Sequence, residues 1–322
     1  MRVAFLRSSC LIDDFLTLGT IKEMLVYLKL ILTAIFWGGT FIAGRVVAKD
    51  VGPFSAAFFR FFIASIFLIL FTYKIEGRLP VLRKRQIIPV FLLGMTGVFL
   101  YNVFFFKGLK IIHAGRAAVI IAGNPIFITL FSAYFFKEKL SLIKVIGIIL
   151  SVTGAVIVIS KGSFDEIISG GVGWGEIFIF GCVFSWVAYS LIGKAVMDDL
   201  SPLAAVSYSS VIGAFFLFFP ALFEGAIQNF RHYYPVDWVG MFYLGFFGTV
   251  IGFVWYYEGI KKIGPMKASL FINFVPISAV VMAFFILDEP ITLSLFIGTL
   301  LVCSGVYLTN KRFTPDLIKS TV

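Results

Sequence analysis

The sequence has little charge and few of the residues from which catalytic or metal sites are built. Only 14% of its 322 residues are charged, against roughly 25% in soluble domains. It has two histidines, and its three cysteines, Cys10, Cys182 and Cys303, lie far apart. The sequence contains no HExxH, Walker A or GxSxG motif. We therefore expect no disulfide framework, no metal site and no cofactor, and we expect that the chain is not an enzyme.

Apolar residues make up 60% of the chain and give it a mean hydropathy of +1.02. Because so few polar residues cannot cover a soluble globule, the lipid bilayer is the expected solvent. The net charge of +10 is carried by short loops between apolar runs, which suits anionic lipid head groups. There is no basic stripe of the kind that binds nucleic acid. The expected partners are the bilayer and a small-molecule substrate, with no nucleic acid, and both a monomer and a homodimer are compatible with the sequence.

Ten apolar runs are long enough to cross a bilayer, which takes about 20 helical residues. The sequence therefore predicts an all-α integral membrane protein with ten transmembrane helices. The first 23 residues precede the first strong run, and we expect an N-terminal extension with little structure there. The runs lie near residues 25–44, 53–73, 86–106, 115–136, 141–160, 174–194, 202–222, 237–257, 265–287 and 290–309.

The distribution of lysine and arginine predicts the orientation. With the N-terminus inside, the inner segments hold 18 of these residues and the outer loops hold 7. Cytoplasmic loops carry the excess of positive charge in membrane proteins. We therefore expect a multi-pass protein of the plasma membrane, or of the inner membrane in a bacterium, with both termini cytoplasmic.

The two halves of the chain resemble each other in register. An offset of 149 residues relates Trp37 to Trp186 and Pro53 to Pro202. From the third helix of each half onward the offset becomes 151, which relates Gly97 to Gly248, Pro125 to Pro276, Glu138 to Glu289, and Gly154 to Gly305. We call positions related by these offsets equivalent.

The repeat divides the chain into a first half, residues 24–160, and a second half, residues 174–310. Residues 161–173 are the predicted linker, and residues 311–322 are a predicted cytoplasmic tail. Each half holds five helices. Because five is odd, the second half enters the membrane upside down, giving a 5+5 inverted-topology repeat of the kind found in secondary transporters.

The motifs of each half point to a known family. The stretch 36–45, FWGGTFIAGR, precedes Pro53 and the tripeptide 59–61, and each half ends in an acidic turn followed by two glycines. Over residues 25–310 these features resemble the EamA-type repeats of the drug/metabolite transporter superfamily. The resemblance implies a ten-helix exporter or exchanger of metabolites with a central cavity between the first, third, fourth, sixth, eighth and ninth helices. The second half departs from the first at Ser209, which is equivalent to Arg60.

Candidate substrate-binding residues are Arg60, which lies well inside a span, and the polar and aromatic side chains away from the loop ends on the helices that the resemblance places around the cavity. A ligand pocket is mostly apolar with a few well-placed polar groups, and this set has that character. The candidates are Trp37, Thr40, Arg60, Tyr101, Asn102, Asn124, Trp186, Tyr189, Trp255 and Asn273.

Two groups of candidates keep alternative interpretations. Arg60 lies about 10 Å along its helix from Pro53; it contacts the substrate, or it holds helices together by binding backbone carbonyls. Pro125 and Pro276 fall inside predicted helices at equivalent positions and should kink them. These kinks are hinges beside the cavity, or they are ordinary packing kinks.

The resulting functional prediction is a secondary transporter that exports or exchanges a small metabolite by alternating access, with amino-acid-like solutes favoured by the resemblance. A carrier of a lipid or lipid-linked intermediate is the alternative within transport. An integral-membrane enzyme, a receptor or a scaffold is the alternative from other classes. No carboxylate lies at the middle of a predicted span, which argues against exchange of protons for cationic drugs.

Overall fold

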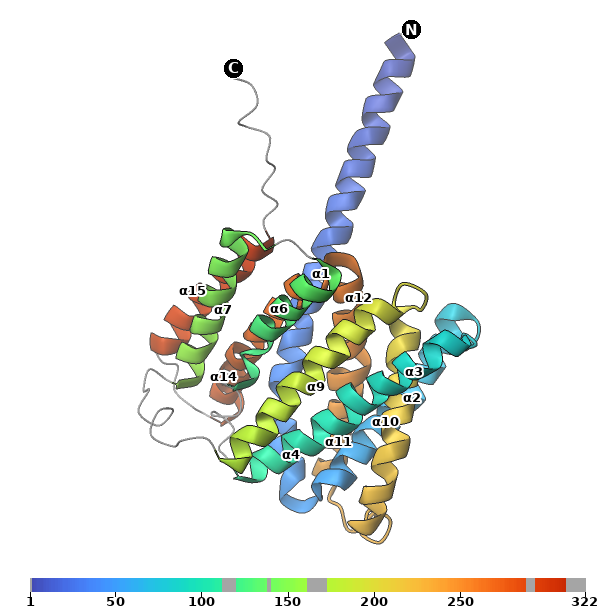
Figure 1. Cartoon of the computed structure of the whole chain (residues 1–322), viewed down its shortest axis with the longest axis vertical. Coiled ribbons are helices and arrows are strands. Elements are labelled where there is room, and N and C mark those ends of the chain that lie inside the picture. The colour runs from blue at the N-terminus through green and yellow to red at the C-terminus, as the bar shows by residue number, and fades with distance from the viewer. Residues whose placement is uncertain (1, 112–119, 138–139, 161–172, 288–292, 311–322) are drawn as a thin grey trace.

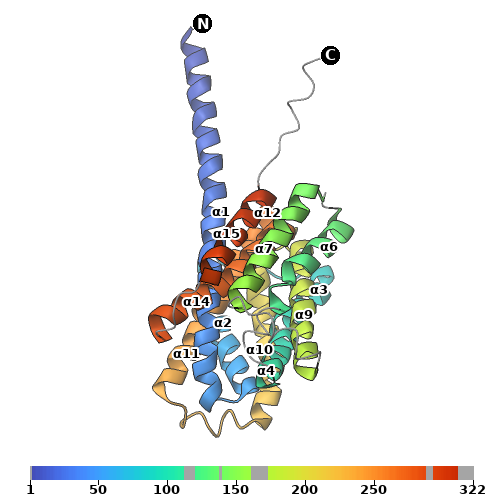
Figure 2. The ribbon, with the colours of Figure 1, turned by 90° about the vertical axis from the view of Figure 1, so that its left-hand side faces the viewer.

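The computed structural model describes residues 2–111, 120–137, 140–160, 173–287 and 293–310, and this part of the chain forms only helices and the turns between them (Figure 1). The helices gather into one bundle, and the N-terminal end of the first helix projects beyond it (Figures 1 and 2). Their bounds are α1 Arg2–Asp50, α2 Pro53–Glu76, α3 Lys84–Leu93, η1 Gly94–Leu100, α4 Tyr101–Ile111, α6 Asn124–Phe136, α7 Leu142–Ser160, α9 Trp174–Val196, α10 Pro202–Phe223, α11 Pro235–Gly245, η2 Phe246–Ile251, α12 Gly252–Ile263, α13 Pro265–Ser269, η3 Leu270–Asn273, α14 Phe274–Leu287 and α15 Leu293–Asn310.

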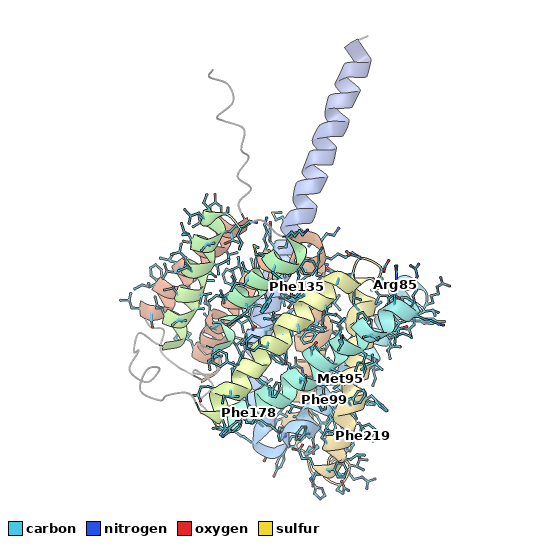
Figure 3. All side chains as sticks on the ribbon, in the orientation of Figure 1. Arg85, Met95, Phe99, Phe135, Phe178 and Phe219 are labelled. Atoms are coloured by element: carbon cyan, nitrogen blue, oxygen red, sulfur yellow. The ribbon has the colours of Figure 1, made fainter. Side chains whose placement is uncertain are left out.

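Within the described residues, six helices are long and apolar enough to cross a membrane. They are Met24–Asp50, Pro53–Glu76, Lys84–Gly108, Trp174–Val196, Pro202–Phe223 and Pro235–Ile263. Shorter apolar helices cover Asn124–Phe136, Leu142–Ile157 and Phe296–Thr309. Large apolar side chains such as Phe135 and Phe219 are exposed on the outside of the bundle, as suits a surface in contact with lipid (Figure 3).

The N-terminal segment differs from its prediction. Residues 2–23, expected to have little structure, continue α1 without a break. No proline precedes Pro53, so nothing in this stretch removes a backbone donor or forces the helix to end. Of the other predicted segments, residues 161–172 of the linker and the tail 311–322 lie outside the described residues.

The neighbouring helices α2 and α10 run antiparallel, and a carboxylate from each caps the start of the other. The Glu224 carboxylate, at the end of α10, accepts hydrogen bonds from Ser55 N at 2.7 Å and Ser55 Oγ at 2.8 Å. At the opposite end, Glu76 accepts a hydrogen bond from the hydroxyl of Ser201, the residue that caps α10. Negative charge at a helix N-terminus is stabilising because the first backbone N–H groups have no partner within the helix.

The third apolar stretch of each half contains a π-helical turn at the same place. The turn η1 joins α3 to α4, and η2 joins α11 to α12. The last residues of the two turns, Leu100 and Ile251, are equivalent. π-Helical turns are rare and occur often at functional sites. Their recurrence shows that the repeat extends from sequence to local backbone geometry.

Close backbone contacts are also exchanged between the halves. A Cβ atom on Gly94 would lie 3.1 Å from the carbonyl oxygen of Ser209, and one on Gly245 would lie 2.8 Å from that of Arg60. Gly94 is equivalent to Gly245, and Arg60 to Ser209. The contact of Gly94 in the first half with Ser209 in the second is therefore repeated by the contact of Gly245 in the second half with Arg60 in the first. A reciprocal pair of contacts like this is typical of a two-fold relation.

The helices α7 and α15 pack against each other through small residues (Figures 1 and 2). Gly147 faces the backbone of Gly305, and Gly154 faces the backbone of Gly298. As the chain advances from 147 to 154, its partner runs backward from 305 to 298, so these equivalent helices are antiparallel. Glycine lets membrane helices approach this closely.

The helix geometry changes beside both predicted kink prolines. Pro125 and Pro276 each lie near the start of an α-helix that directly follows a turn or a 3-10 helix, and their role as hinges stays a prediction. The helix α6 begins at Asn124 after a turn, and α14 follows the short 3-10 helix η3. The first helical turn tolerates proline because its N–H groups have no partner within the helix. Both prolines thus mark broken helices.

Candidate functional site

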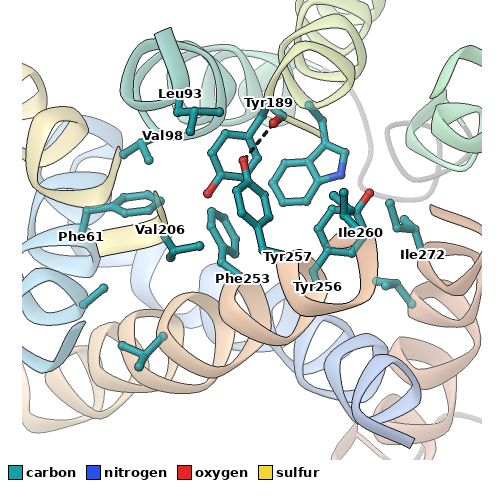
Figure 4. Close-up of a cluster of buried hydrophobic side chains, with 14 of the residues drawn as sticks. Phe61, Leu93, Val98, Tyr189, Val206, Phe253, Tyr256, Tyr257, Ile260 and Ile272 are labelled. Carbon is teal, nitrogen blue, oxygen red and sulfur yellow. Dashed lines mark hydrogen bonds between the residues drawn. The ribbon is translucent and has the colours of Figure 1, made fainter. Parts of the chain in front are cut away.

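Aromatic rings fill the middle of the bundle. The rings of Trp37 and Trp186 meet edge to face with centroids 5.3 Å apart. Phe253 lies 5.2 Å from Trp186, and Tyr256 lies 5.4 Å from Trp37. The Tyr189 ring packs 4.7 Å from that of Tyr257, whose hydroxyl donates a hydrogen bond to the carbonyl oxygen of Tyr189 at 2.8 Å (Figure 4). We call these six residues the central aromatic cluster.

Three predicted site residues, Trp37, Trp186 and Tyr189, belong to the central aromatic cluster, and a fourth, Tyr101, packs against it with its ring 5.4 Å from that of Trp186. The structure brings these four residues together, with their rings packed on one another, and none of them is among the described residues that line the cavity between α1, α2, α10 and α12. Their role in binding substrate stays a prediction. Trp186 is 5% exposed and Tyr189 is fully buried. Packing of these aromatic rings against one another buries a large apolar area and allows the edge-to-face arrangement that aromatic pairs prefer.

One side-chain hydrogen bond joins the first helix to the π-helical turn η2, and a second lies within the first helix. The indole Nε1 of Trp37 donates to the carbonyl oxygen of Gly248 at 2.8 Å. The hydroxyl of Thr40 donates to the carbonyl oxygen of Trp37 at 2.6 Å. A π-helical turn leaves carbonyl groups without their usual partner one turn along the helix. Trp37 supplies a donor to one of them.

Arg60 is buried, with 9% of its surface exposed. Its Nε donates to Thr249 Oγ1 at 3.0 Å, and its guanidinium lies 5.0 Å from the ring of Phe61 and 5.9 Å from that of Phe253. These contacts join α2 to η2 and to the central aromatic cluster. Arg60 is not among the described residues that line the cavity between α1, α2, α10 and α12.

The three predicted asparagines occupy separate places. Asn102 Nδ2 donates to the carbonyl oxygen of Val98 at 2.7 Å, and Asn273 Nδ2 donates to Ser151 Oγ at 3.0 Å. Asn124 begins α6, so Asn124 and Asn273 both stand at helix breaks. The side-chain oxygen of each asparagine is buried and accepts no hydrogen bond from the described residues. Buried acceptors of this kind are uncommon and suit a polar ligand or water.

A cavity of about 690 Å³ lies at one end of the bundle, between α1, α2, α10 and α12. Its rim includes the exposed residues Lys261 and Lys262, and its inner part reaches the buried Val250. Of the predicted site residues, Trp255 belongs to this lining. The described lining consists of Leu25, Val26, Lys29, Phe71, Ile75, Glu76, Ser201, Pro202, Leu203, Val250, Ile251, Val254, Trp255, Glu258, Lys261 and Lys262.

An ion pair that the sequence analysis missed lies on the wall of this cavity. Lys29 Nζ and Glu258 Oε2 are 2.6 Å apart. Lys29 falls inside the first predicted span, and Glu258 stands one residue beyond the predicted end of the eighth. The sequence did offer one indication of this pair, because the two opposite charges lie near the same predicted membrane side of two apolar helices. Their pairing depends on how α1 and α12 pack, which the sequence alone does not specify.

The opposite end of α2 and α10 is covered by aromatic residues. Trp238 packs 4.8 Å from the ring of Phe230 and 5.2 Å from that of Phe59. Tyr233 packs beside them, and burial raises the pKa of its phenol; the nearby carboxylates of Glu224 and Asp237 raise it further, while a hydrogen bond with Ser55 lowers it. The phenol therefore stays protonated near neutral pH. We call Phe59, Phe230, Tyr233 and Trp238 the end cluster.

Comparison with known proteins decides the family. The model of the EamA-like transporter family matches residues 24–160 and again residues 173–311. The chain belongs to this family. The prediction from its motifs is confirmed, and the two EamA matches correspond to the two halves of the sequence.

Relatives of the EamA chain are described as transporters. An uncharacterized transporter of Bacillus subtilis, YyaM, is 30% identical over 88% of this chain and 93% of its own. An uncharacterized transporter of Archaeoglobus fulgidus is 30% identical over 89% of this chain and 99% of its own. A protein of Streptantibioticus cattleyicolor named "Probable terminal-alkyne amino-acid exporter" is 27% identical over 88% of this chain and 92% of its own.

The fold also has a solved counterpart. A protein of known crystal structure superposes with a TM-score of 0.69 over 88% of this chain and 97% of its own, at 18% identity. That likeness concerns the fold alone. Together with the long apolar helices, the family shows a multi-pass membrane protein, and the relatives' names indicate a transporter rather than an enzyme.

Proposed function

We propose that this EamA protein is a secondary transporter that exports or exchanges a small metabolite by alternating access. The main support for this proposal is the cavity between α1, α2, α10 and α12, which is open at one end of the bundle. Beyond it, among the described residues, the rings within the central aromatic cluster and within the end cluster pack against one another. A cavity open at one end with packed side chains beyond it fits one state of an alternating-access carrier.

The membrane arrangement that goes with this function is ten helices in a 5+5 inverted repeat. In support, equivalent glycines meet reciprocally across the halves, and α7 runs antiparallel to its equivalent helix α15. An exchange of this kind between antiparallel helices implies a two-fold axis in the membrane plane. Broken helices recur at equivalent positions, as they do around substrate sites of inverted-repeat transporters. The broken segment 265–287, formed by α13, η3 and α14, would supply the ninth span.

The proposed orientation places the cavity on the cytoplasmic side. Its rim carries Lys261 and Lys262, which belong to the segments that the positive-inside rule assigns to the cytoplasm. The structure would then correspond to an inward-facing state, ready to accept a solute from the cell. An amino-acid-like solute is favoured, in keeping with the name of the relative from Streptantibioticus cattleyicolor.

Transport is tested with the purified chain in liposomes loaded with a pool of small metabolites. We expect time-dependent loss of one solute class from the vesicles, and counterflow of the labelled solute, which a passive channel does not produce. Empty liposomes are the control. Movement of labelled lipid between leaflets, with no loss of any soluble metabolite, would favour the lipid carrier instead.

Topology is tested by single cysteines in a background without Cys10, Cys182 and Cys303. Arg83→Cys and Asn229→Cys replace exposed residues at opposite ends of the bundle. An impermeant maleimide should label Asn229→Cys in whole cells and Arg83→Cys after permeabilisation. Labelling of both from the same side would contradict the inverted arrangement.

A further inference from the structure

The ion pair of Lys29 and Glu258 remains accessible from the cavity. Lys29 projects from α1 and Glu258 from α12, and their side chains are 26% and 35% exposed. Both line the cavity, and Lys29 Nζ lies 5.8 Å from the ring centre of Trp255, another lining residue. A solute in the cavity can therefore reach the cation, the anion and an aromatic face together.

The backbone around this pair has a counterpart in the other half. Gly259 of α12 packs against Leu30 of α1, with a Cβ position 2.7 Å from the leucine side chain. The equivalent Gly108 of α4 packs against the equivalent Ile179 of α9, at 2.5 Å. The two helix pairs thus approach each other in the same way, residue for residue.

The side chains at the two places differ. The positions equivalent to Lys29 and Glu258 hold Phe178 and Lys107, and the Lys107 Nζ lies 5.8 Å from the Phe178 ring. The same helix packing is therefore achieved without an ion pair. Since the fold does not require opposite charges at this position, the pair at the cavity calls for another explanation.

The chemistry of the cavity selects among ligands. A solute that carries both charges can bind its anion to Lys29 and its cation to Glu258, leaving neither protein charge unpaired. A solute with one charge breaks the pair and leaves its other member without a partner, which is costly in a partly dehydrated site. The ammonium group also suits the face of Trp255, and the apolar residues Phe71 and Val254 suit an apolar side group.

We propose that Lys29 and Glu258 bind the head group of a zwitterion that carries an apolar side group, namely a free apolar amino acid. The proposal rests on the transport function proposed above and names its substrate class. In the empty carrier the two residues neutralise each other. When the zwitterion binds, its carboxylate takes the place of Glu258 beside Lys29, and its ammonium takes the place of Lys29 beside Glu258. Each protein charge is therefore paired both before and after binding.

The test measures binding to the full-length purified chain by isothermal titration calorimetry. The probes are L-leucine, L-methionine and L-phenylalanine, followed by the decarboxylated amine and the deaminated acid of the tightest binder. The wild type should bind the amino acid at least about tenfold more tightly than either analogue, about 1.4 kcal/mol. Lys29→Gln should erase the preference over the amine, and Glu258→Gln should erase the preference over the acid.

The matched control is Lys74→Gln, which removes an exposed cation of α2 that is not among the described residues lining the cavity and should leave both preferences intact. If the single variants do not fold, the exchange Lys29→Glu with Glu258→Lys restores an ion pair. The exchanged protein should bind the amino acid within about tenfold of the wild type, again about 1.4 kcal/mol. Loss of all amino-acid binding in a folded exchanged protein would overturn the proposal.

Other outcomes separate this site from the function on which it rests. If none of the three amino acids binds while the liposomes transport another metabolite, the zwitterion site is wrong and the transport function stands. Unchanged preferences in folded Lys29→Gln and Glu258→Gln also refute the site alone. Absence of both binding and transport of any pooled metabolite refutes the proposed function together with the site.

Discussion

Arg60 of α2 and its equivalent Ser209 of α10 have similar backbone packing around them and different side-chain contacts. At each of them, a glycine that precedes or opens a π-helical turn meets the backbone of the opposite half. Arg60 reaches across to Thr249, whereas Ser209 bonds to its own helix at Val206 and lies 3.4 Å from the hydroxyl of Tyr189. The equivalent glycines therefore set how closely the helices approach in both places, and the side chains that differ between the halves make the two places chemically different.

The largest effect on stability is expected from replacing Arg60, because the equivalent position of the second half holds a serine. Arg60→Ala should lower the free energy of unfolding by about 2–4 kcal/mol, because it leaves a cavity and deprives Thr249 of a charged donor. The equivalent change Ser209→Ala should cost about 1 kcal/mol or less. Thermal unfolding of the detergent-purified variants measures both. A stable Arg60→Ala protein with weakened affinity for an anionic substrate would show instead that this arginine binds the substrate.

A smaller effect on stability is expected at the contact between α7 and α15, where the two halves have the same glycines. Gly154→Ala and Gly305→Ala each place a methyl group against the backbone of the facing helix, at Gly298 and Gly147 respectively. Each should lower the free energy of unfolding by about 1–3 kcal/mol, and the two costs should agree to about 1 kcal/mol, since the positions are equivalent. Gly44→Ala is the control, because nothing lies within 4 Å of its Cβ position. Strongly unequal costs would contradict equivalent packing of α7 and α15.

The smallest effects are expected at the helix breaks. Asn273→Ala removes the hydrogen bond to Ser151 and should lower the free energy of unfolding by about 0.5–1.5 kcal/mol. A double-mutant cycle with Ser151→Ala isolates that bond. If the asparagines also contact the substrate, Asn124→Ala and Asn273→Ala should each weaken its affinity by about 0.5–1.5 kcal/mol. Wild-type transport by both variants, at equal expression, would remove them from the site.

The helical content followed from composition because lipid offers the backbone no hydrogen bonds. The predicted runs 53–73 and 202–222 correspond to α2 and α10 within a few residues. The broken helices at Asn124 and Asn273 were not predicted, although Pro125 and Pro276 marked them. Proline suits both a kink and a first turn, and the surrounding packing chooses between the two.

The structure brings part of the predicted set together, while its role in binding stays a prediction. Trp37, Tyr101, Trp186 and Tyr189 lie on helices that the family resemblance places around the cavity, and their rings pack together. The sequence indicated an aromatic site, but it could not indicate that the rings would pack closed while the cavity opened around Trp255. The proposed alternating access requires more than one packing of the same residues, and a periodic sequence pattern describes all of these packings equally.

By itself, the sequence determined the apolar surroundings, the all-helical fold class and the two-fold repetition of the family motif, because each depends on local composition and on register along the chain. Only the tertiary structure decided which charges meet. Lys29 and Glu258 are 229 residues apart, and their 2.6 Å contact depends on the crossing of α1 and α12, which is fixed by side-chain packing summed over the bundle. Their equivalents Phe178 and Lys107 share that crossing with different chemistry, so the same backbone carries a charged pair at one end and none at the other.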